Sequence, residues 1–392
     1  MHADLADLFE LDLDLTHLNH GAFGAVPRSV RQAQDRARTA IERAPMRAFR
    51  DELPIGLTAA REAAAGFVGV PADSAALVRN VSEGIAVVLE ALGVGPGDEV
   101  VVSNHGYPTA AYAVQARGAT VRTAVFGLDA DSADVVAALA DALTERTRLV
   151  IVDHITSPTA LVLPVAEVAA AVGPVPVLVD AAHVPGALPG LDVEALGVDF
   201  WVGNLHKWAY APRSAATLWV APAHRDRVRP LVTSWSHGLP FPSSFDLQGT
   251  VDHSAWLAVP DGIAAWRSLG GWAQVSRNAQ LLRWGAEHVR SALGTTSPRG
   301  GIPTAPCLEV VALPPGVADT PEGAEALWQQ LYAVGFVVPP VSFAGRGLVR
   351  LAAAPYNDES DYARLAGALV ALVGTAPGGP SAARSAARSG AC

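Results

Sequence analysis

The chain has 392 residues; half are hydrophobic and 17% are charged, so it can form a large core and is not an intrinsically disordered protein. Its formal net charge of −10 argues against a general nucleic-acid-binding protein and against binding to anionic membranes. Two cysteines, Cys307 and Cys392, are too few for a disulfide framework or a cysteine-rich zinc site.

The N-terminal ten residues are acidic and lack the basic start of a signal peptide. No apolar run approaches the roughly 20 residues that a membrane span needs. We therefore expect a soluble cytoplasmic protein.

From about Leu77 the chain alternates short apolar runs with stretches of helical character, which is typical of a mostly parallel α/β sheet. The predicted strands are Leu77–Arg79, Glu99–Ser103, Thr120–Thr123, Leu149–Asp153, Val175–Asp180 and Phe200–Gly203. The predicted helices between them are Ser82–Leu92, Pro108–Ala116, Ser132–Leu143 and Pro164–Val172. Because polar residues follow most of these strands, we expect a ligand crevice beyond their carboxyl ends.

After about Gly270 the pattern changes to longer helices, Trp272–Leu293 and Thr320–Val334, with strands near Cys307–Leu313 and Leu348–Ala352. This pattern predicts a smaller α+β domain over residues 269–374, after a large domain with its N-terminal segment over residues 1–268. The tail, residues 375–392, is rich in Ala, Ser, Gly and Pro and is predicted to be disordered.

A single lysine, Lys207, stands among 27 arginines. Arginine stays protonated in proteins, whereas a lysine whose pKa is lowered can act as a neutral amine nucleophile or base. One lysine in such a chain therefore indicates a task that arginine cannot perform, although its survival by chance is the alternative.

The surroundings of Lys207 suggest what that task is. Lys207 follows a predicted strand, and Asp180 ends the strand before it, 27 residues earlier. Pyridoxal phosphate chemistry requires such a pair, because a lysine amine forms an imine with the cofactor aldehyde and a carboxylate keeps the pyridine nitrogen protonated. Taken alone, Asp180 would be read as a helix cap or a turn residue.

A phosphate site is predicted at Asn80–Gly84, which follows a strand and opens a helix. Backbone N–H groups at such a helix start, together with the Ser82 hydroxyl, can bind an anion. His206, next to the lysine, supplies a further candidate donor. No metal site is predicted, because His17 and His20 lie on a loop and the other histidines show no ligand pattern.

Several motifs in this order resemble the class V aminotransferase family of fold type I pyridoxal phosphate enzymes, most closely its isopenicillin N epimerase-like branch. The motifs that carry the resemblance are Leu18–Gly24, Asn80–Gly84, His105–Pro108, Asp153–Thr159, Val179–His183, Gly203–Lys207, Gln248–Thr250, Ala255–Pro260, Val349–Leu351 and Tyr356–Asn357. The resemblance implies an α/β fold with a mostly parallel, seven-stranded type of sheet in a large domain, plus a smaller α+β C-terminal domain.

The resemblance also implies the cofactor, pyridoxal 5'-phosphate, and roles for individual residues around it. Lys207 would form the imine, Asp180 would pair with the pyridinium nitrogen and His183 would lie near the phenolic oxygen. Tyr107, or less readily His105, would stack on the ring.

Phosphate and substrate contacts are implied in the same way. Ser82, Glu83 through its backbone and His206 would bind the phosphate. Gly249 and Thr250 would reach the phosphate of a neighbouring subunit, which implies a homodimer with shared sites. Arg350 would bind the substrate carboxylate in a bidentate manner, and Asn19 and His20 would line the substrate side.

The expected activity is chemistry at the α-carbon of an amino acid or an amino-acid-bearing peptide. In an epimerase Lys207 would remove the α-proton, and Tyr107 or His105 would return one on the opposite face. A carbon–sulfur lyase, an aminotransferase and a non-catalytic ligand-binding member of the fold are the alternatives. The stretch Pro339–Gly347 has no cysteine, which argues against a persulfide-forming desulfurase.

Overall fold

A seven-stranded sheet carries the larger part of the chain in the computed structural model, which describes residues 7–296 and 300–374. Its strand order is β2-β8-β7-β6-β5-β3-β4, and β8 alone runs antiparallel to its neighbours in this sheet. The strands are β2 (Ala75–Val78), β3 (Glu99–Ser103), β4 (Thr120–Ala124), β5 (Thr147–Asp153), β6 (Val177–Asp180), β7 (Phe200–Asn204) and β8 (Ala216–Val220).

Helices cover both faces of this sheet because successive side chains of a strand point to opposite sides. Val100 and Val102 of β3 pack in the core with α6 (Val81–Ala91) and α7 (Pro108–Ala116). Val101 points the other way, into the core with α8 (Ser132–Asp141) and α9 (Val165–Ala171). The nearly continuous apolar strands are therefore those of a parallel sheet that is buried on both faces.

The six strands predicted for this sheet are all present, each within two residues of its expected ends. The strand β8 and a helical layer built from both ends of the large domain were not predicted. That layer contains α2 (His20–Phe23), α3 (Arg28–Arg43), α4 (Pro45–Arg47), η1 (Ala48–Glu52), α5 (Leu53–Val68), α10 (Ser254–Leu257) and α11 (Val259–Ser268). Residues of α5, α10 and α11 share one apolar cluster, which joins the two segments.

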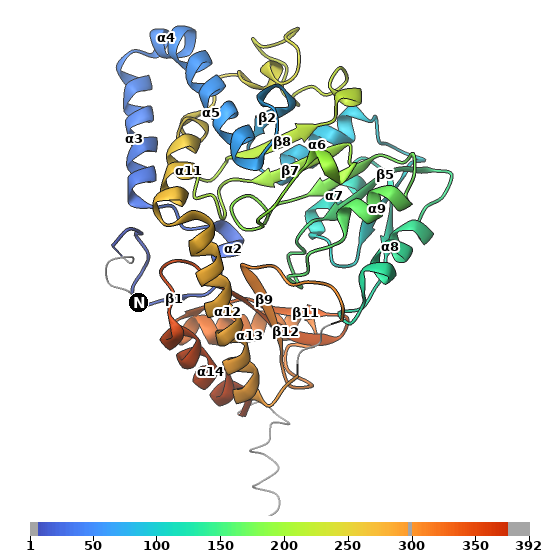
Figure 1. Cartoon of the computed structure of the whole chain (residues 1–392), viewed down its shortest axis with the longest axis vertical. Helices are drawn as coiled ribbons and strands as arrows, with labels where there is room; N and C mark the ends of the chain where they lie inside the picture. The colour runs from blue at the N-terminus through green and yellow to red at the C-terminus, as the bar shows by residue number, and fades with distance from the viewer. Residues whose placement is uncertain (1–6, 297–299, 375–392) are drawn as a thin grey trace, which may run out of the picture.

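The C-terminal part forms a separate layer below the large sheet, and the long helix α12 (Gly271–Leu293) runs down into it (Figure 1). Here α12, α13 (Pro321–Ala333) and α14 (Glu359–Gly374) pack with an antiparallel sheet of order β11-β12-β9. Its strands are β9 (Leu308–Ala312), β11 (Pro340–Phe343) and β12 (Arg346–Ala352). The predicted disordered tail lies outside the described residues.

The N-terminal segment joins the two layers. Its strand β1 (Thr16–His17) pairs in parallel with β10 (Phe336–Val337) of the C-terminal part, and Leu18 packs in that part's core. The chain then enters α2, which lies beside the large sheet's cavity. Among the described residues, no helix is both long enough and apolar enough to cross a bilayer.

The start of α6 is held in place by a cap and by a glycine. The Asn80 side chain accepts a hydrogen bond of 2.9 Å from the Glu83 amide, as an N-cap does. One turn on, Gly84 faces β7, where an added Cβ would lie 2.5 Å from a methyl carbon of Val202. The glycine therefore allows the helix to approach the sheet closely.

Gly84→Ala should lower the stability of the protein by about 1–3 kcal/mol, because the added methyl overpacks the α6–β7 contact. Gly66→Ala is the matched control. Gly66 lies within helix α5, and an added Cβ there would meet no neighbouring atom within 4 Å, so the same change should stabilise the protein by about 0.4–1 kcal/mol. Urea unfolding of both variants measures the difference, and equal midpoints would contradict the close packing.

Candidate active site

A cavity of about 300 Å³ opens beyond the carboxyl ends of β5, β6 and β7, where the sequence predicted the ligand crevice. Most of its lining residues are polar, and they come from several segments that are distant in the sequence. The residues are Ala22, Phe23, Asn80, Val81, Ser82, Tyr107, Asp153, Ser157, Asp180, Ala182, His183, Asn204, His206, Lys207, Arg213 and Ser214.

Lys207 reaches this cavity from the turn after β7. Its Nζ lies 3.3 Å from His183 Nε2. Burial, together with the charge of Arg350, lowers the pKa of the Lys207 amine to about 8, although Asp180 and Asp153 oppose the shift. The amine is therefore neutral far more often near pH 7 than that of an ordinary lysine, as a nucleophile or base requires.

The backbone of Lys207 is held by His20, which is 4% exposed. The Ala25 amide donates to His20 Nδ1 at 3.3 Å, so the ring carries its hydrogen on Nε2, which donates to the Lys207 carbonyl at 3.0 Å. Burial lowers the pKa of His20 to about 4. The expectation that His20 lines the substrate side is therefore corrected, because both ring nitrogens are bonded within the protein.

Asp180 lies at the end of β6, as predicted, and Asp153 is its register partner at the end of β5. Asp180 Oδ1 accepts a hydrogen bond of 3.0 Å from the Ala182 amide. Burial raises the pKa of both carboxyl groups, and the charge of Asp180 raises that of Asp153 further. In the sequence, Asp153 opened one of the motifs that carry the family resemblance, but it was given no individual role among the site residues.

His183 follows β6 and is 2% exposed. Burial, with the charge of Lys207, places the pKa of His183 well below the usual value, so the ring is neutral. Its Nδ1 has no hydrogen-bond partner in the described part of the chain. An unpartnered buried nitrogen at a cavity wall is a feature that a bound group can satisfy.

The segment predicted to bind phosphate lines the cavity through Asn80, Val81 and Ser82. Ser82 is exposed at the start of α6, and the structure gives its amide no partner among the described residues. The Glu83 amide is not available, because it donates to the Asn80 side chain. The predicted backbone contact of Glu83 with a phosphate is thus corrected. Its carboxylate instead forms an ion pair with Arg79, in which Oε1 lies 2.8 Å from the guanidinium Nη2.

Two further side chains complete this end of the cavity. His206 Nδ1 donates to the Ala215 carbonyl at 3.1 Å, and burial lowers the pKa of His206 to about 4, so Nε2 presents a lone pair. A bound phosphate would favour the protonated ring, in which Nε2 donates. Arg213, which sequence reasoning missed, lines the same end and donates to the Gly24 carbonyl at 3.2 Å. No local motif marks it.

Tyr107 is exposed at the cavity, whereas His105 is buried and does not line it. Tyr107 precedes α7, is 49% exposed and lines the cavity. His105 is fully buried, stacked on Phe126, and bonded to the Phe126 carbonyl at 3.1 Å and to Thr159 Oγ1 at 2.8 Å. The predicted stacking or catalytic role of His105 is therefore corrected, because neither ring nitrogen faces the cavity.

Arg350 extends from β12 toward the cavity's edge and is 7% exposed. It donates to the Ser157 carbonyl at 2.6 Å and to Asn19 Oδ1 at 2.9 Å, while its Nε has no partner in the described part of the chain. Burial lowers the pKa of Arg350 to about 10. A buried guanidinium without a carboxylate is suited to bind an anionic ligand. Arg350 and Asn19 are hydrogen-bonded to each other, and their roles in binding a substrate stay predictions.

Gly249 and Thr250 do not line this cavity, and Thr250 is exposed. They were predicted to reach the site of a neighbouring subunit, and within a single chain that contact stays a prediction. Among the described residues, no three His, Cys, Asp or Glu side chains gather in a group that could hold a metal ion.

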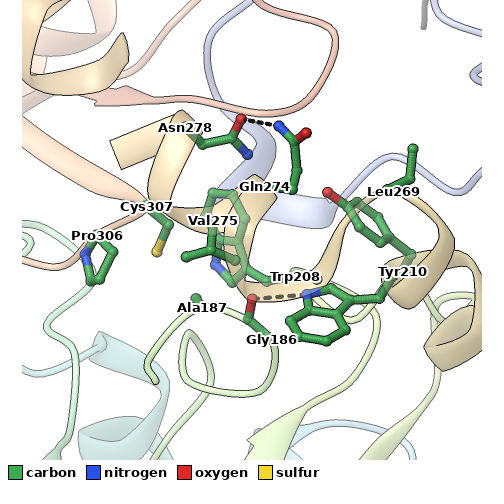
Figure 2. Close-up of a pocket in the computed structure, with 12 residues that line it drawn as sticks. Gly186, Ala187, Trp208, Tyr210, Leu269, Gln274, Val275, Asn278, Pro306 and Cys307 are labelled. Atoms are coloured by element: carbon green, nitrogen blue, oxygen red, sulfur yellow. Dashed lines mark hydrogen bonds between the residues drawn. The ribbon is translucent and has the colours of Figure 1, made fainter. Parts of the chain in front are cut away.

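A second, much smaller cavity of about 10 Å³ is lined by Trp208, Tyr210 and Cys307, among other residues (Figure 2). The Gly186 carbonyl accepts from the Trp266 indole at 3.1 Å there, and Gln274 donates to Asn278 at 2.6 Å. Cys307 also borders it, and burial raises the pKa of its thiol to about 12. This space lacks the charged groups of the larger cavity and has no room for a cofactor.

A family model described as aminotransferase class-V matches residues 26–236. The chain belongs to this family. The class-V assignment and the fold together indicate pyridoxal 5'-phosphate as the cofactor, and the larger cavity suits it. Its lining includes a lysine amine, two carboxyl groups and a helix start with an amide that has no partner among the described residues.

Two relatives indicate the range of activities near this chain. Isopenicillin N epimerase of Streptomyces clavuligerus is 31% identical, over 93% of this chain and 96% of the relative. L-cysteine desulfhydrase of Arabidopsis thaliana is 28% identical, over 92% of this chain and 88% of the relative.

Solved structures confirm the fold type. A cystine C-S lyase in complex with its reaction product, cysteine persulfide, matches with a TM-score of 0.76 at 22% identity, over 91% of this chain and 97% of that one. A variant of the lyase with glycine covalently linked to its PLP cofactor matches with a TM-score of 0.75 at 24% identity, over 91% of this chain and 96% of that one. The predicted fold class is confirmed.

The pKa of the Lys207 amine should be about 8 in cofactor-free protein, and Arg350→Ala should raise it, because that change removes a neighbouring positive charge. Lysine labelled with carbon-13 at Cε gives a single side-chain signal in this protein, so an NMR titration follows it directly. Arg346→Ala, an exposed residue of the same strand, is the control. A value near the ordinary 10.4 would contradict the buried site.

Proposed function

We propose that this protein catalyses proton transfer at the α-carbon of an amino acid or an amino-acid-bearing peptide, as an epimerase similar to isopenicillin N epimerase. The observation that carries the proposal is the placement of two candidate acid–base groups, Lys207 and Tyr107, on opposite flanks of one cavity. Lys207 follows β7 and Tyr107 follows β3, and β6 and β5 lie between these strands in the sheet.

Residues of this chain would bind the ring and the phosphate of the cofactor. Lys207 would attach it through its amine, Asp180 would face the ring nitrogen and His183 would lie beside the ring. Ser82 and His206 would bind the phosphate, and Arg213 is within the same end of the cavity. When bound, pyridoxal 5'-phosphate supplies an electron sink for the negative charge that develops at the substrate α-carbon.

Substrate binding and proton transfer would fall to groups at the cavity's edge. Arg350, oriented by Asn19 and Ser157, would bind the α-carboxylate. Lys207, with a pKa lowered by burial to about 8, would take the α-proton. The Tyr107 hydroxyl, which bonds no protein group among the described residues, would return a proton on the other face.

A carbon–sulfur lyase is the second candidate, and a specific similarity favours it. Plant L-cysteine desulfhydrase matches over 92% of the chain, nearly as much as the epimerase does. Both reactions begin with loss of the α-proton, so the Lys207–Asp180 pair does not distinguish them. The two reactions are distinguished by whether the substrate has a leaving group at its β-carbon and by whether an acid lies on the opposite flank of the cavity.

Incubation with candidate amino acids and peptides in deuterated buffer tests the proposal. An epimerase incorporates deuterium at the α-carbon and yields both configurations without releasing a keto acid. Tyr107→Phe should slow inversion by about 10²-fold or more, while exchange of the original configuration persists, because only the returning acid is lost. Stoichiometric pyruvate and ammonia from cysteine would establish a lyase, and keto-acid-dependent amino transfer would establish an aminotransferase.

We further propose that the active form is a homodimer. Support comes from the exposed apolar residues of the segment before Gly249 and Thr250: Trp235 is 92% exposed, and Leu231, Val232 and Leu239 are each more than 40% exposed. Exposed apolar patches of this kind mark protein interfaces. A second copy placed there would bring Thr250 toward the phosphate end of its partner's cavity.

Thr250→Ala should weaken cofactor retention, whereas Thr123→Ala, on the exposed edge strand β4, should not. Lys207→Ala mixed with Thr250→Ala should recover about a quarter of wild-type activity, because half of the dimers then contain one intact site. Sedimentation of the holoenzyme gives the oligomeric state, and a fully active monomer would contradict this arrangement.

A further inference from the structure

Two carboxyl groups lie side by side at the floor of the Lys207 cavity, and the proposed function uses only one of them. Asp153 and Asp180 are register partners in the adjacent parallel strands β5 and β6. Strands in a sheet are about 4.8 Å apart, and register partners of parallel strands point to the same face. Both residues line the cavity, and each is 4% exposed.

Neither carboxyl group has an ion-pair partner among the described residues. Asp180 accepts a hydrogen bond of 3.0 Å from the Ala182 amide, and Asp153 accepts a longer one of 3.3 Å from the Tyr107 amide. The second Asp153 oxygen faces the turn at Gly106, where an added Cβ would lie 3.2 Å from it. Asp180 is thus the better stabilised of the two as an anion.

Other charged and titratable groups around the pair come from three further segments. They are Lys207 after β7, Tyr107 at the start of α7 and His183 after β6, and the charge of Arg350 of β12 acts in turn on Lys207 and His183. Lys207 is the cation that acts on both carboxyl groups, and one positive charge cannot neutralise two buried negative charges. Two like charges at this separation in a buried site do not both ionise near neutral pH.

We propose that Asp153 and Asp180 hold one proton between them and that Asp153 is the member that carries it. Asp153 is then a positioning residue: it leaves Asp180 as the single negative charge that faces the cofactor's ring nitrogen, and its own O–H can donate to the neighbouring carboxylate. The functional meaning rests on the proposed role of Asp180, but the shared proton is a property of the protein itself.

The sign of the pH effect follows from the raised pKa values. Above the ordinary aspartate pKa of about 4, the unfolded chain has lost a proton that the folded pair keeps. The stability that this proton contributes is present at low pH and is lost as the pH rises toward the folded pKa of the pair. A variant that cannot share the proton does not lose this stability as the pH rises.

Urea unfolding of the full-length holoenzyme between about pH 5 and about pH 8 tests the proposal. The midpoint of Asp153→Asn should rise relative to that of the wild type as the pH increases, whereas Asp141→Asn, an exposed change at the end of α8, should follow the wild type. Parallel profiles for Asp153→Asn and wild type would overturn the proposal. Asp180→Asn should lose the same pH dependence, so it serves if Asp153→Asn does not fold.

The absorbance of the bound cofactor gives a second readout that a purely structural role would not predict. Asparagine is neutral, like a protonated carboxylic acid, so the pH midpoint of this absorbance in Asp153→Asn should stay within about 0.3 unit of the wild-type value. A displacement of about one unit or more would show that Asp153 is charged in the wild type, and would overturn the proposal. If α-proton exchange failed for every substrate while both readouts behaved as expected, the proposed function would fall and the shared proton would stand.

Discussion

Three adjacent parallel strands end at the same edge of the sheet, with β7 extending two residues beyond the level at which β5 and β6 end, and the site depends on this arrangement. Asp153, Asp180 and Asn204 end β5, β6 and β7, so their side chains meet at one edge of the sheet, with Lys207 just beyond. Asp153 and Asp180 are each only 4% exposed there. Burial disfavours charge of either sign, so it lowers the pKa of the Lys207 amine and raises that of the carboxyl groups. The register thus sets the acid–base behaviour of the cavity.

Much of this could be predicted from the sequence because the informative signals are local. Apolar runs that end in polar residues identified the strands, and the lone Lys207 after such a run, with Asp180 one strand earlier, indicated the chemistry. The strand β8 and the helices α3 and α5 were not predicted, since their patterns precede or follow the regular alternation. Arg213 lies in no motif, and the Asp153–Thr159 motif gave Asp153 no individual role; only the folded chain shows that both residues line the cavity.

The errors at the site have a common physical cause. His20, His105 and Glu83 all lie within segments that reach the cavity, although none of the three lines it. Proximity along the chain does not give direction, however. The two histidine rings bond backbone carbonyls through one nitrogen, and the Glu83 amide bonds the Asn80 cap. Each polar atom satisfied in this way is unavailable to a ligand, and such bonding cannot be read from a motif.

The bonding of His20 has a mechanical consequence. Its Nε2 donates to the Lys207 carbonyl, while its Nδ1 is 3.0 Å from the hydroxyl of Tyr356, which follows β12 in the C-terminal layer. The imidazole therefore connects the two layers of the molecule through a hydrogen bond at each ring nitrogen. If the C-terminal layer rotates toward the cavity when a ligand binds, either one of these two hydrogen bonds breaks or the backbone of Lys207 moves with the layer. Closure and the alignment of the reactive amine are thus mechanically linked in this fold.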